Sequence, residues 1–357
     1  MSGFFKKVSN RLKMTSKNFK NDTKFSHRLA VFRLKADIGG RLGFTKMSEK
    51  AKNNKDEWIL NYLRKQILSV KQKYENDAST GDRPENAVIW VCWWTGVDSA
   101  PALVKKCIES TQKHAGNHRV QIITKDNYGD FINIPDYIMS KVNSGAMGYA
   151  NFSDYLRISL LEKYGGLWLD ATIFCAADVP DLCFALPFYT CKSEVKKGTY
   201  LSEYQWTSFC IGGYAHNIFF KFLKDAFEVY WQNNETAVDY LFFDYLIYIA
   251  KESNAEIKRL MELVPINNVH RDDLQAAMNR AADPGEWDQI VQSDTVLYKL
   301  SWRESYSATT PDGKESIYGY FLRKKSNGIC SINGALLGKG GKTNGYLCNS
   351  VKSGRNS

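Results

Sequence analysis

The sequence predicts an α/β fold in which a mostly parallel central sheet is flanked by helices, with an added helical segment at the N-terminus. Residues 87–94 read AVIWVCWW, and residues 167–169 read LWL directly after two glycines. Continuous apolar runs bounded by turn residues are typical of strands that are covered on both faces. The order strand, helix, strand over residues 87–124 also requires a crossover connection, which makes these two strands parallel.

Charge is distributed unevenly along the 357 residues. Residues 1–55 hold 15 Lys or Arg and 3 Asp or Glu, a net charge of +12, and residues 323–357 hold 7 Lys or Arg and no acid. Because the whole chain has 48 basic and 38 acidic residues, residues 56–322 keep 26 basic and 35 acidic ones, a net charge of −9. A nucleic-acid-binding fold carries its positive charge on the folded face that meets phosphate, so nucleic acid is not the expected partner.

The basic N-terminal arm favours an anionic membrane surface as a partner. Between residues 4 and 25, basic side chains alternate with phenylalanine and leucine. Such a segment can place its apolar side chains in the headgroup layer while its lysines meet anionic lipid. A solvated arm with no such role is the alternative interpretation.

We expect a cytoplasmic protein that is peripheral on the inner face of the plasma membrane. No stretch approaches the roughly 20 apolar residues of a spanning helix, and the N-terminus lacks the apolar core of a signal peptide. The eight cysteines form no CxxC pair, which favours a reducing compartment.

The segment before the first strand predicts helices. Residues 27–36 suit a short helix, which Gly39-Gly40 and a linker rich in lysine and asparagine would follow. Residues 56–75 predict a stronger helix, because apolar side chains recur three and four positions apart and form one face. The expected organisation is a basic arm at 1–55, a helix and linker at 56–86, a main domain at 87–322 and a flexible basic tail at 323–357.

A polar cluster is expected between the helix over residues 151–164 and the strand that follows it. Asp154 and Arg157 are three positions apart, so they lie about 60° from each other round the helix and can point the same way. Asp170 follows the strand at 167–169, at the carboxyl end where open α/β sheets place their ligands. One cation and two anions therefore predict a small polar site, with a purely structural ion pair as the alternative.

The whole string resembles the SDxxR and GGxWxD signature of sugar-nucleotide glycosyltransferases of the GT-A type. The resemblance is in particular to the capsular polysaccharide synthesis family and its relatives, the mannosyltransferase-like and clostridial-toxin glucosyltransferases. The matching residues are Ser153, Asp154, Arg157, Gly165, Gly166, Trp168 and Asp170. The resemblance covers residues 87–302. It implies a GT-A, Rossmann-like fold in which Asp154 and Arg157 hold the donor sugar and Asp170 binds a divalent metal, Mn²⁺ or Mg²⁺, on the diphosphate.

The acidic motif departs from the usual pattern of GT-A enzymes, although Asp-Ala-Thr resembles the form of the capsular branch. Where Asp-x-Asp is common, this chain has Asp170-Ala171-Thr172. A hydroxyl is a weaker ligand than a carboxylate for a hard cation. We therefore expect Thr172 to reach the metal through water, or other oxygens to complete the metal's ligand set.

The end of the first strand is the expected base-binding position. The segment resembles the IWxxWWxG opening of the capsular family, matched by Ile89, Trp90, Trp93, Trp94 and Gly96. Trp93 or Trp94 can stack on the nucleobase, whereas Trp90 is expected to pack in the core. After the next strand, at residues 120–124, Asp126 would reach a ribose or base, with a solvated turn as the alternative.

Two further segments add candidates. Lys299-Leu300 resembles the KL of the capsular family, and Ser301-Trp302 resembles the element that closes over the donor diphosphate in the toxin-like relatives. A cation there would offset the charge of the leaving group. Asp244 interrupts an apolar helix at 237–252, which makes it a candidate for the acceptor site or a structural aspartate.

The expected function is a metal-dependent glycosyltransferase. It would move a sugar from a nucleotide-sugar, a UDP-sugar by preference, to a growing surface polysaccharide or a lipid-linked glycan, and the relatives imply retention of anomeric configuration. Two alternatives stay open. The weakened motif at Thr172 would suit a protein that binds nucleotide-sugar without turnover, and the basic ends would suit an anionic-polymer binder.

Overall fold

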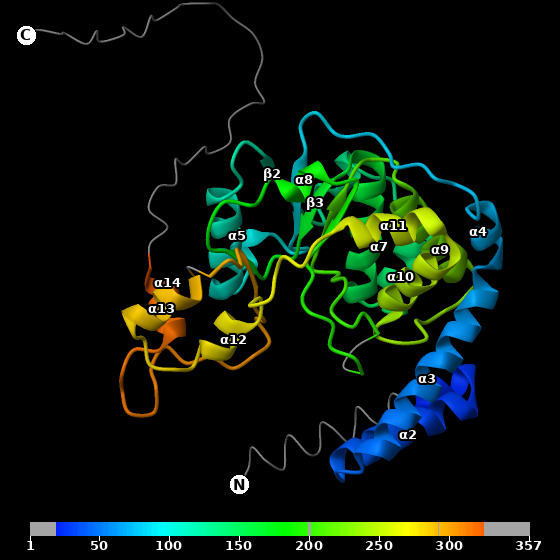
Figure 1. Cartoon of the computed structure of the whole chain (residues 1–357), viewed down its shortest axis with the longest axis horizontal. Helices are drawn as coiled ribbons and strands as arrows, with labels where there is room; N and C mark the ends of the chain where they lie inside the picture. The colour runs from blue at the N-terminus through cyan, green and yellow to red at the C-terminus, as the bar shows by residue number, and fades with distance from the viewer. Residues whose placement is uncertain (1–18, 199–200, 292, 325–357) are drawn as a thin grey trace, which may run out of the picture. The chain divides into compact units, whose positions relative to one another are not determined.

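The computed structural model describes residues 19–198, 201–291 and 293–324. The predicted basic tail lies outside the described residues from position 325, as does most of the N-terminal segment expected to meet lipid. The central sheet has five strands in the order β2-β1-β3-β6-β5, and Figure 1 shows it at the middle of the fold. The strands are β1 (Val88–Cys92), β2 (Arg119–Ile123), β3 (Gly166–Leu169), β5 (Phe188–Thr190) and β6 (Cys210–Gly213).

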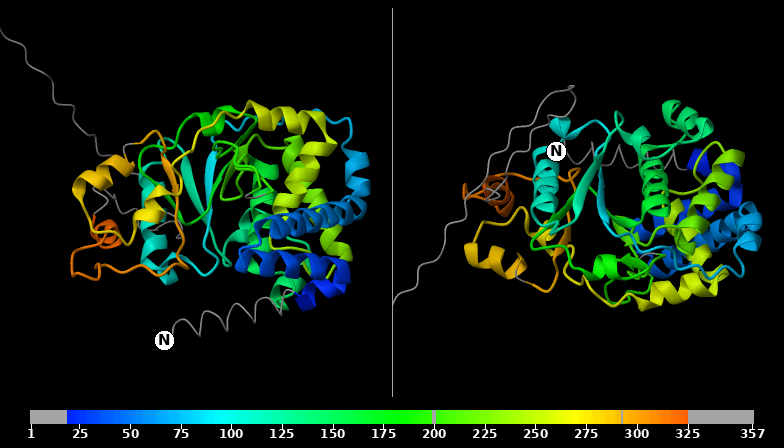
Figure 2. Two further views of the ribbon diagram at one scale, coloured as in Figure 1. Left: turned by 60° about the horizontal axis from the view of Figure 1, so that its bottom comes forward. Right: turned by 90° about the horizontal axis from the view of Figure 1, so that it is seen from above.

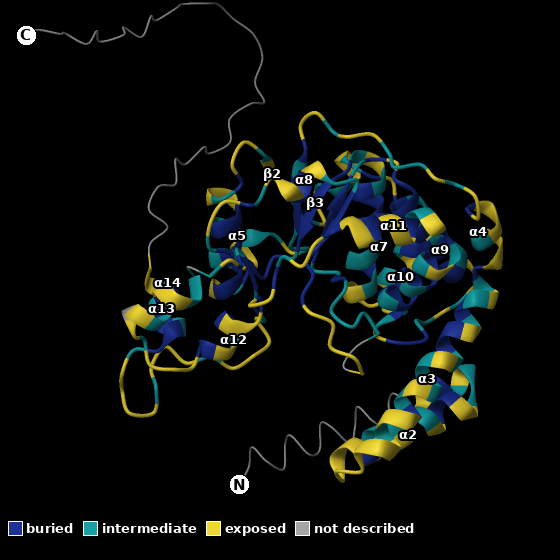
Figure 3. Cartoon of the chain, viewed as in Figure 1, coloured by how far each residue is buried: buried dark blue, intermediate teal, exposed yellow. Residues whose placement is uncertain are grey.

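The sheet is mostly parallel, as predicted. β1 pairs in parallel with both β2 and β3, β6 runs antiparallel to β3, and β5 runs antiparallel to β6. All four residues of β3 and the three central residues of β1 are buried, and Figure 3 shows these strands as part of the buried interior. The prediction of strands covered on both faces is confirmed.

Helices lie on both sides of the sheet. Figure 2 shows α5 on one side and α7, α9 and α10 on the other. The helices of this domain are α5 (Ala102–Lys113), α6 (Asp136–Asn143), α7 (Tyr149–Tyr164), α8 (Leu182–Ala185), α9 (Ile218–Asn233), α10 (Phe242–Ser253), α11 (Ala255–Leu263), α12 (Asp273–Ala277), α13 (Pro284–Val291) and α14 (Ile317–Arg323). The α/β fold class is therefore confirmed.

A glycine pair joins α7 to β3. Gly165 and Gly166 have φ angles of +64° and +94°, which glycine adopts without steric cost. A Cβ atom on Gly166 would lie 2.3 Å from the carbonyl oxygen of Val88. The missing side chain thus lets β3 pair directly with β1, and Asp170 emerges at the end of β3.

A two-stranded ribbon brings a distant segment to the same edge. β4 (Ile173–Cys175) pairs antiparallel with β7 (Leu297–Lys299), and the register sets Ile173 opposite Lys299. Because β4 begins three residues after Asp170, this pairing fixes Lys299 beside the end of β3.

The N-terminal helical segment is present but differs from the prediction. α2 (His27–Arg41) continues through Gly39-Gly40, and α3 (Thr45–Gln66) begins well before residue 56, so the expected linker is helical. A Cβ atom on Gly39 would lie 3.1 Å from both Met47 Cε and Ser48 N. The prediction of a break at the glycines was wrong because close packing of the two helices outweighs the low helix propensity of glycine.

Buried charge ties this segment to the main domain. Asp239, which precedes α10, accepts hydrogen bonds from Arg33 of α2 at 2.9 Å and Lys55 of α3 at 3.4 Å. Burial opposes its ionisation, but these two cations outweigh the burial and lower the pKa of Asp239. A short helix, α4 (Leu68–Lys73), then leads towards β1. Among the described residues, none of the helices combines the length and the apolarity needed to cross a membrane.

Candidate active site

The carboxyl ends of β1 and β3 and the end of β7 open into one cleft of about 460 Å³. Of the ten residues that the sequence predicts to bind the donor or its metal, nine line this cleft: Trp93, Trp94, Asp154, Arg157, Asp170, Thr172, Lys299, Ser301 and Trp302. They come from four separate segments of the chain. The fold therefore brings the sequence motifs together at the edge of the sheet where α/β proteins place ligands.

Asp126 is the exception. Its side chain is exposed and is not among those that line the cleft. Its backbone N–H donates to Thr124 Oγ1 at 3.2 Å, and the Asn127 side chain closes the same turn by accepting from the N–H of Thr124 at 2.8 Å. The residues around Asp126 thus form a hydrogen-bonded turn, and a turn was the alternative interpretation.

Arg157 lies at the centre of the site. Its side chain is 4% exposed; Nη1 donates to Asp154 Oδ1 and Nη2 donates to Asp170 Oδ1 at 3.0 Å. The guanidinium carbon lies 4.8 Å from the ring centroid of Trp168 and 5.6 Å from that of Phe243. Two carboxylates and two aromatic faces hold the fork in one orientation, while Nε has no hydrogen-bond partner in the described part of the chain.

Both carboxylate oxygens of Asp170 accept hydrogen bonds from other side chains. Oδ1 accepts from Arg157 and from Trp168 Nε1 at 3.0 Å, and Oδ2 accepts from Lys299 Nζ at 2.8 Å. Burial opposes the charged form, but Lys299 and Arg157 outweigh the burial and lower the pKa of Asp170. The same lysine donates to Thr172 Oγ1 at 2.8 Å. Asp170 is therefore a fixed anion between two cations.

These contacts bear on the expected metal. A divalent ion at Asp170 and Thr172 would need the lone pairs of their oxygens at about 2.0 to 2.6 Å. Lys299 donates to both residues, and the described residues contain no group of three or more His, Cys, Asp or Glu that could hold a metal. The residues as arranged do not fit a divalent ion, so Mn²⁺ or Mg²⁺ stays a prediction without structural support.

Tryptophans stand at the mouth of the cleft. The Trp93 and Trp302 rings meet edge to face with centroids 5.9 Å apart, and Trp94 packs edge to face on Phe152 at 5.0 Å. Trp302 is 45% exposed. Trp90 instead is buried and donates from Nε1 to the Gly165 carbonyl at 2.9 Å, which confirms its expected place in the core.

The acceptor candidate Asp244 also lines the cleft. It accepts from Trp206 Nε1 at 2.9 Å, and burial raises its pKa to about 6. Burial likewise raises the pKa of Asp154 to about 7, although Arg157 opposes that rise. The acid on an apolar helix was the signal for Asp244. Sequence reasoning missed its neighbour Phe243, because nothing local distinguishes it from a core phenylalanine.

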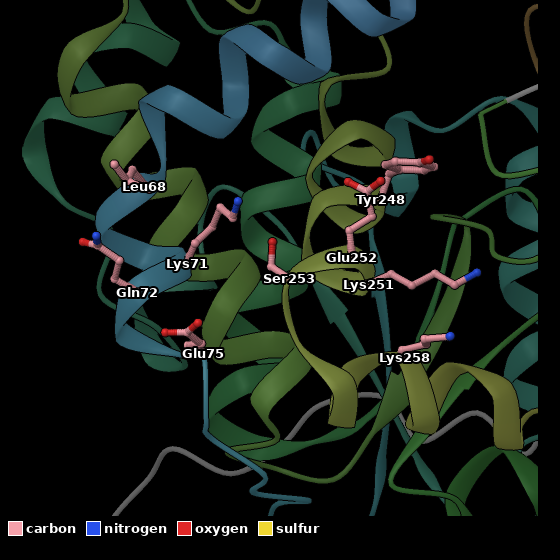
Figure 4. Close-up of a pocket in the computed structure, with 9 residues that line it drawn as sticks. All are labelled: Leu68, Lys71, Gln72, Glu75, Tyr248, Lys251, Glu252, Ser253 and Lys258. Carbon is pink, nitrogen blue, oxygen red and sulfur yellow. The ribbon is translucent and has the colours of Figure 1, made fainter.

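A second cavity, of about 800 Å³, lies between α4, α10 and α11 and contains no residue of the predicted site. Figure 4 shows the residues that line it: Leu68, Lys71, Gln72, Glu75, Tyr248, Lys251, Glu252, Ser253 and Lys258. Both signs of charge are interspersed there. The convergent ion pairs of the first cleft make that cleft the better candidate for chemistry.

The solved structure of the PaToxG glycosyltransferase matches with a TM-score of 0.28 and 14% identity, covering 66% of this chain and 97% of that chain. No curated protein matches. The family described as "Capsular polysaccharide synthesis protein" matches residues 41–321, a span that includes every cleft residue named above. Since this match extends over most of the chain, the protein belongs to the capsular polysaccharide synthesis protein family.

Proposed function

We propose that the protein is a glycosyltransferase that moves a sugar from a nucleotide-sugar, by preference a UDP-sugar, to a growing capsular or other surface polysaccharide or to a lipid-linked glycan. The observation that carries the proposal is the clamped guanidinium of Arg157. It lies between Asp154 and Asp170 at the base of a cleft with tryptophans at its mouth. Family membership supports the same role.

The donor sugar and diphosphate suit the polar floor of the cleft. Sugar hydroxyls both donate and accept hydrogen bonds. Asp154 offers carboxylate oxygens, and Arg157 holds that carboxylate in place through Nη1. Because neighbouring side chains already fix both groups, little ordering entropy remains to be lost when the donor binds.

The nucleobase suits the aromatic mouth. Trp93, Trp94 and Trp302 present ring surfaces at the ends of β1 and β7. Stacking of a base on an aromatic side chain contributes roughly 1 to 3 kcal/mol and tolerates different bases. This site therefore supports a nucleotide donor, while the choice of UDP comes from the family resemblance.

The acceptor suits the rim formed by two exposed tyrosines. Tyr149 is 65% exposed and Tyr240 is 74% exposed, and both line the cleft. Aromatic faces of this kind offer a flat apolar surface to a sugar ring. Asp244, in α10 shortly after Tyr240, would hold an acceptor hydroxyl.

The transfer balances without a further reactant. The bond between the anomeric carbon and the diphosphate oxygen breaks, and its electron pair stays on that oxygen. The acceptor hydroxyl oxygen bonds to the anomeric carbon, and its proton ends on the released diphosphate. Arg157 and Lys299, as fixed cations, stabilise the negative charge that develops on the leaving group. Retention of configuration is carried over from the resemblance as part of the proposal.

We further propose that the enzyme binds peripherally to the cytoplasmic face of the plasma membrane through the turn between α2 and α3. Leu42 and Phe44 in this turn are 63% and 57% exposed, and Ile38 and Met47 beside it are each 41% exposed. Six basic and two acidic residues surround them between positions 27 and 50. The six described cysteines are free thiols, which suits a reducing compartment.

The test is a panel of nucleotide-sugars incubated with the full chain and scored for release of UDP or GDP. One donor should give release, and an added glycan acceptor should increase the rate. Stabilisation of the fold by a donor without any release would instead support the nucleotide-sugar-binding alternative. If no donor binds and none is cleaved, the proposal is overturned.

The variant that tests the site is Arg157→Lys. It keeps the charge but loses the planar fork that bridges two carboxylates, so kcat/KM should fall at least tenfold, about 1.4 kcal/mol. Arg64→Lys is the matched control, because Arg64 forms an exposed ion pair with Glu252 at 2.6 Å outside the cleft. Equal kinetics for Arg157→Lys and wild type would remove Arg157 from the site.

A further inference from the structure

The backbone holds Lys299 against the segment that ends β3. The β4–β7 register sets Lys299 opposite Ile173. The next residue, Leu300, donates its N–H to the carbonyl of Thr172 at 3.0 Å. Strand pairing therefore fixes where the lysine side chain starts, and the side chain is not a surface lysine that happens to lie near an acid.

The ammonium is fixed as well. Nζ lies 2.8 Å from Asp170 Oδ2 and 2.8 Å from Thr172 Oγ1, and 5.3 Å from the ring centroid of Phe209. The side chain is 26% exposed. An ammonium has three N–H donors. Two of them meet these described residues, which leaves the third for an acceptor in the cleft.

The two oxygens that hold this ammonium belong to the two residues that the sequence predicts as metal ligands. A divalent ion bound to the same oxygens would lie against Lys299 and repel it. The threonine also fits better as a partner of lysine. A hydroxyl accepts a hydrogen bond from an ammonium readily, whereas it is a poor ligand for a hard divalent cation.

The cleft can attract a diphosphate without an added ion. It is lined by three cationic side chains, Arg157, Lys299 and Arg303. Of the carboxylates, Asp170 is the anion paired with Arg157 and Lys299, whereas burial raises the pKa of Asp154 to about 7 and that of Asp244 to about 6. Around neutral pH these two acids therefore offset the cations less than ordinary aspartates would.

We propose that Lys299 takes the place of the divalent metal at the donor diphosphate, so that this enzyme binds and cleaves its donor without a metal ion. The proposal rests on the proposed function. Lys299 acts through its position and its hydrogen bonds and transfers no proton. It holds the diphosphate oxygen on which the electron pair remains when the bond to the anomeric carbon breaks, and Asp170 and Thr172 position it.

The first experiment measures nucleotide binding and metal binding separately from turnover. UDP and GDP are titrated into the full chain by calorimetry, once with EDTA and once with Mn²⁺, and free Mn²⁺ is followed by electron paramagnetic resonance. One nucleotide should bind with the same affinity in both buffers, and the protein should take up no Mn²⁺ with or without that nucleotide.

The second experiment uses variants. Lys299→Met keeps most of the stem but removes the charge, so nucleotide affinity in EDTA should fall at least tenfold while the circular-dichroism spectrum is unchanged. Lys299→Arg should recover part of that loss. Lys224→Met is the matched control: Lys224 pairs with Glu162 at 3.0 Å outside the cleft, and its side chain is 32% exposed.

The outcomes separate this proposal from the proposed function. Donor release that EDTA abolishes and Mn²⁺ restores would overturn the role of Lys299 and leave the glycosyltransferase intact. Uptake of Mn²⁺ by wild type that is lost in Asp170→Asn would also overturn the role of Lys299 and leave the glycosyltransferase intact. Absence of nucleotide binding in every buffer would overturn both. If Lys299→Met unfolds, Lys299→Arg serves as the test, with nucleotide affinity measured in EDTA. An affinity below that of wild type would support the proposal, and an unchanged affinity would contradict it.

Discussion

Asp170 receives hydrogen bonds from three side chains that stand far apart in the sequence or on different elements, Arg157, Trp168 and Lys299. Its lowered pKa follows from the two cations, which outweigh its burial. Asp244, in the same cleft, has one neutral donor, and its burial therefore raises its pKa. Two aspartates in one site are thus given opposite protonation behaviour by their neighbours.

The titration of Asp244 predicts a pH dependence of stability. An aspartate in an unfolded chain titrates near about 3.9, whereas the folded pKa is about 6. Between these values the folded protein holds a proton that the unfolded chain has lost. The contribution of Asp244 to the free energy of unfolding therefore rises as pH falls from about 6 towards about 4, by at most about 1.4 kcal/mol per pH unit.

Asp244→Asn removes this titration. Thermal unfolding is measured for wild type and variant from about pH 4 to about pH 7. The melting temperature of wild type should rise relative to that of the variant as the pH falls through about 6. Asp126→Asn, at an exposed turn, is the control and should run parallel to wild type. A constant difference between wild type and Asp244→Asn would show that this carboxyl does not titrate in that range.

Local spacing predicted Asp154, Arg157 and Asp170, because a helix and the strand that follows it determine their mutual position. It could not predict that Lys299 meets Asp170, since the two are 129 positions apart and only the register of a three-residue ribbon joins them. The turn at Asp126 shows the opposite case. Its place just after a strand marked Asp126 as a candidate, but the hydrogen bonds of its own turn account for it.

Among the elements, β3 determines the position of the site. Two glycine pairs show when glycine in a sequence predicts the end of a helix and when it does not. The pair Gly165-Gly166 ends α7 as predicted, because positive φ is required there. The pair Gly39-Gly40 does not end α2, because the approach of α3 to Gly39 is what requires the missing side chain. Glycine in a sequence can thus indicate either a turn or a close contact, and only tertiary structure separates the two.

Gly166→Ala should strongly destabilise the protein. Its Cβ atom would lie 2.3 Å from the carbonyl oxygen of Val88, so β1 and β3 would have to separate. Gly116→Ala is the matched control, since Gly116 also has a positive φ, +60°, but its Cβ would meet nothing within 4 Å. The control should cost about 1 to 2 kcal/mol from backbone strain alone.

Chemical denaturation measures both variants. The free energy of unfolding should fall for Gly166→Ala by at least about 2 kcal/mol more than for Gly116→Ala, because strand separation adds to the strain. Equal losses in the two variants would mean that the β1–β3 contact is less close than described.

At the scale of the molecule, the helical segment α2–α3 is fastened to the main domain through Asp239 and exposes apolar side chains at its far turn. Figure 3 shows exposed residues concentrated along these two helices. An attachment of this kind would limit how far the cleft can move from whatever surface the turn meets. The charge count predicted a basic N-terminal partner surface, but the exposed apolar turn follows only from the helical pairing.

The paired substitution Leu42→Ser and Phe44→Ser tests this surface. Removing two apolar side chains that are more than half exposed should weaken sedimentation of the full chain with anionic vesicles, while donor release in solution stays as in wild type. Ile266→Ser, at a residue that is 56% exposed elsewhere, is the control. Vesicle binding that is unchanged by the paired substitution would exclude this turn as the membrane contact.

The edge-to-face contact of Trp93 and Trp302 makes intrinsic tryptophan fluorescence a probe of the cleft. The two indoles belong to different segments, the end of β1 and the residues after β7, and their ring centroids are 5.9 Å apart. Anything that enters the mouth of the cleft must change the surroundings of one or both rings, and with them the fluorescence of the chain. Rapid mixing with a nucleotide should therefore report the filling of the cleft in real time without a label. The signal should weaken in Trp302→Phe and keep its amplitude in Trp58→Phe, because Trp58 stacks on Tyr62 in α3 outside the cleft.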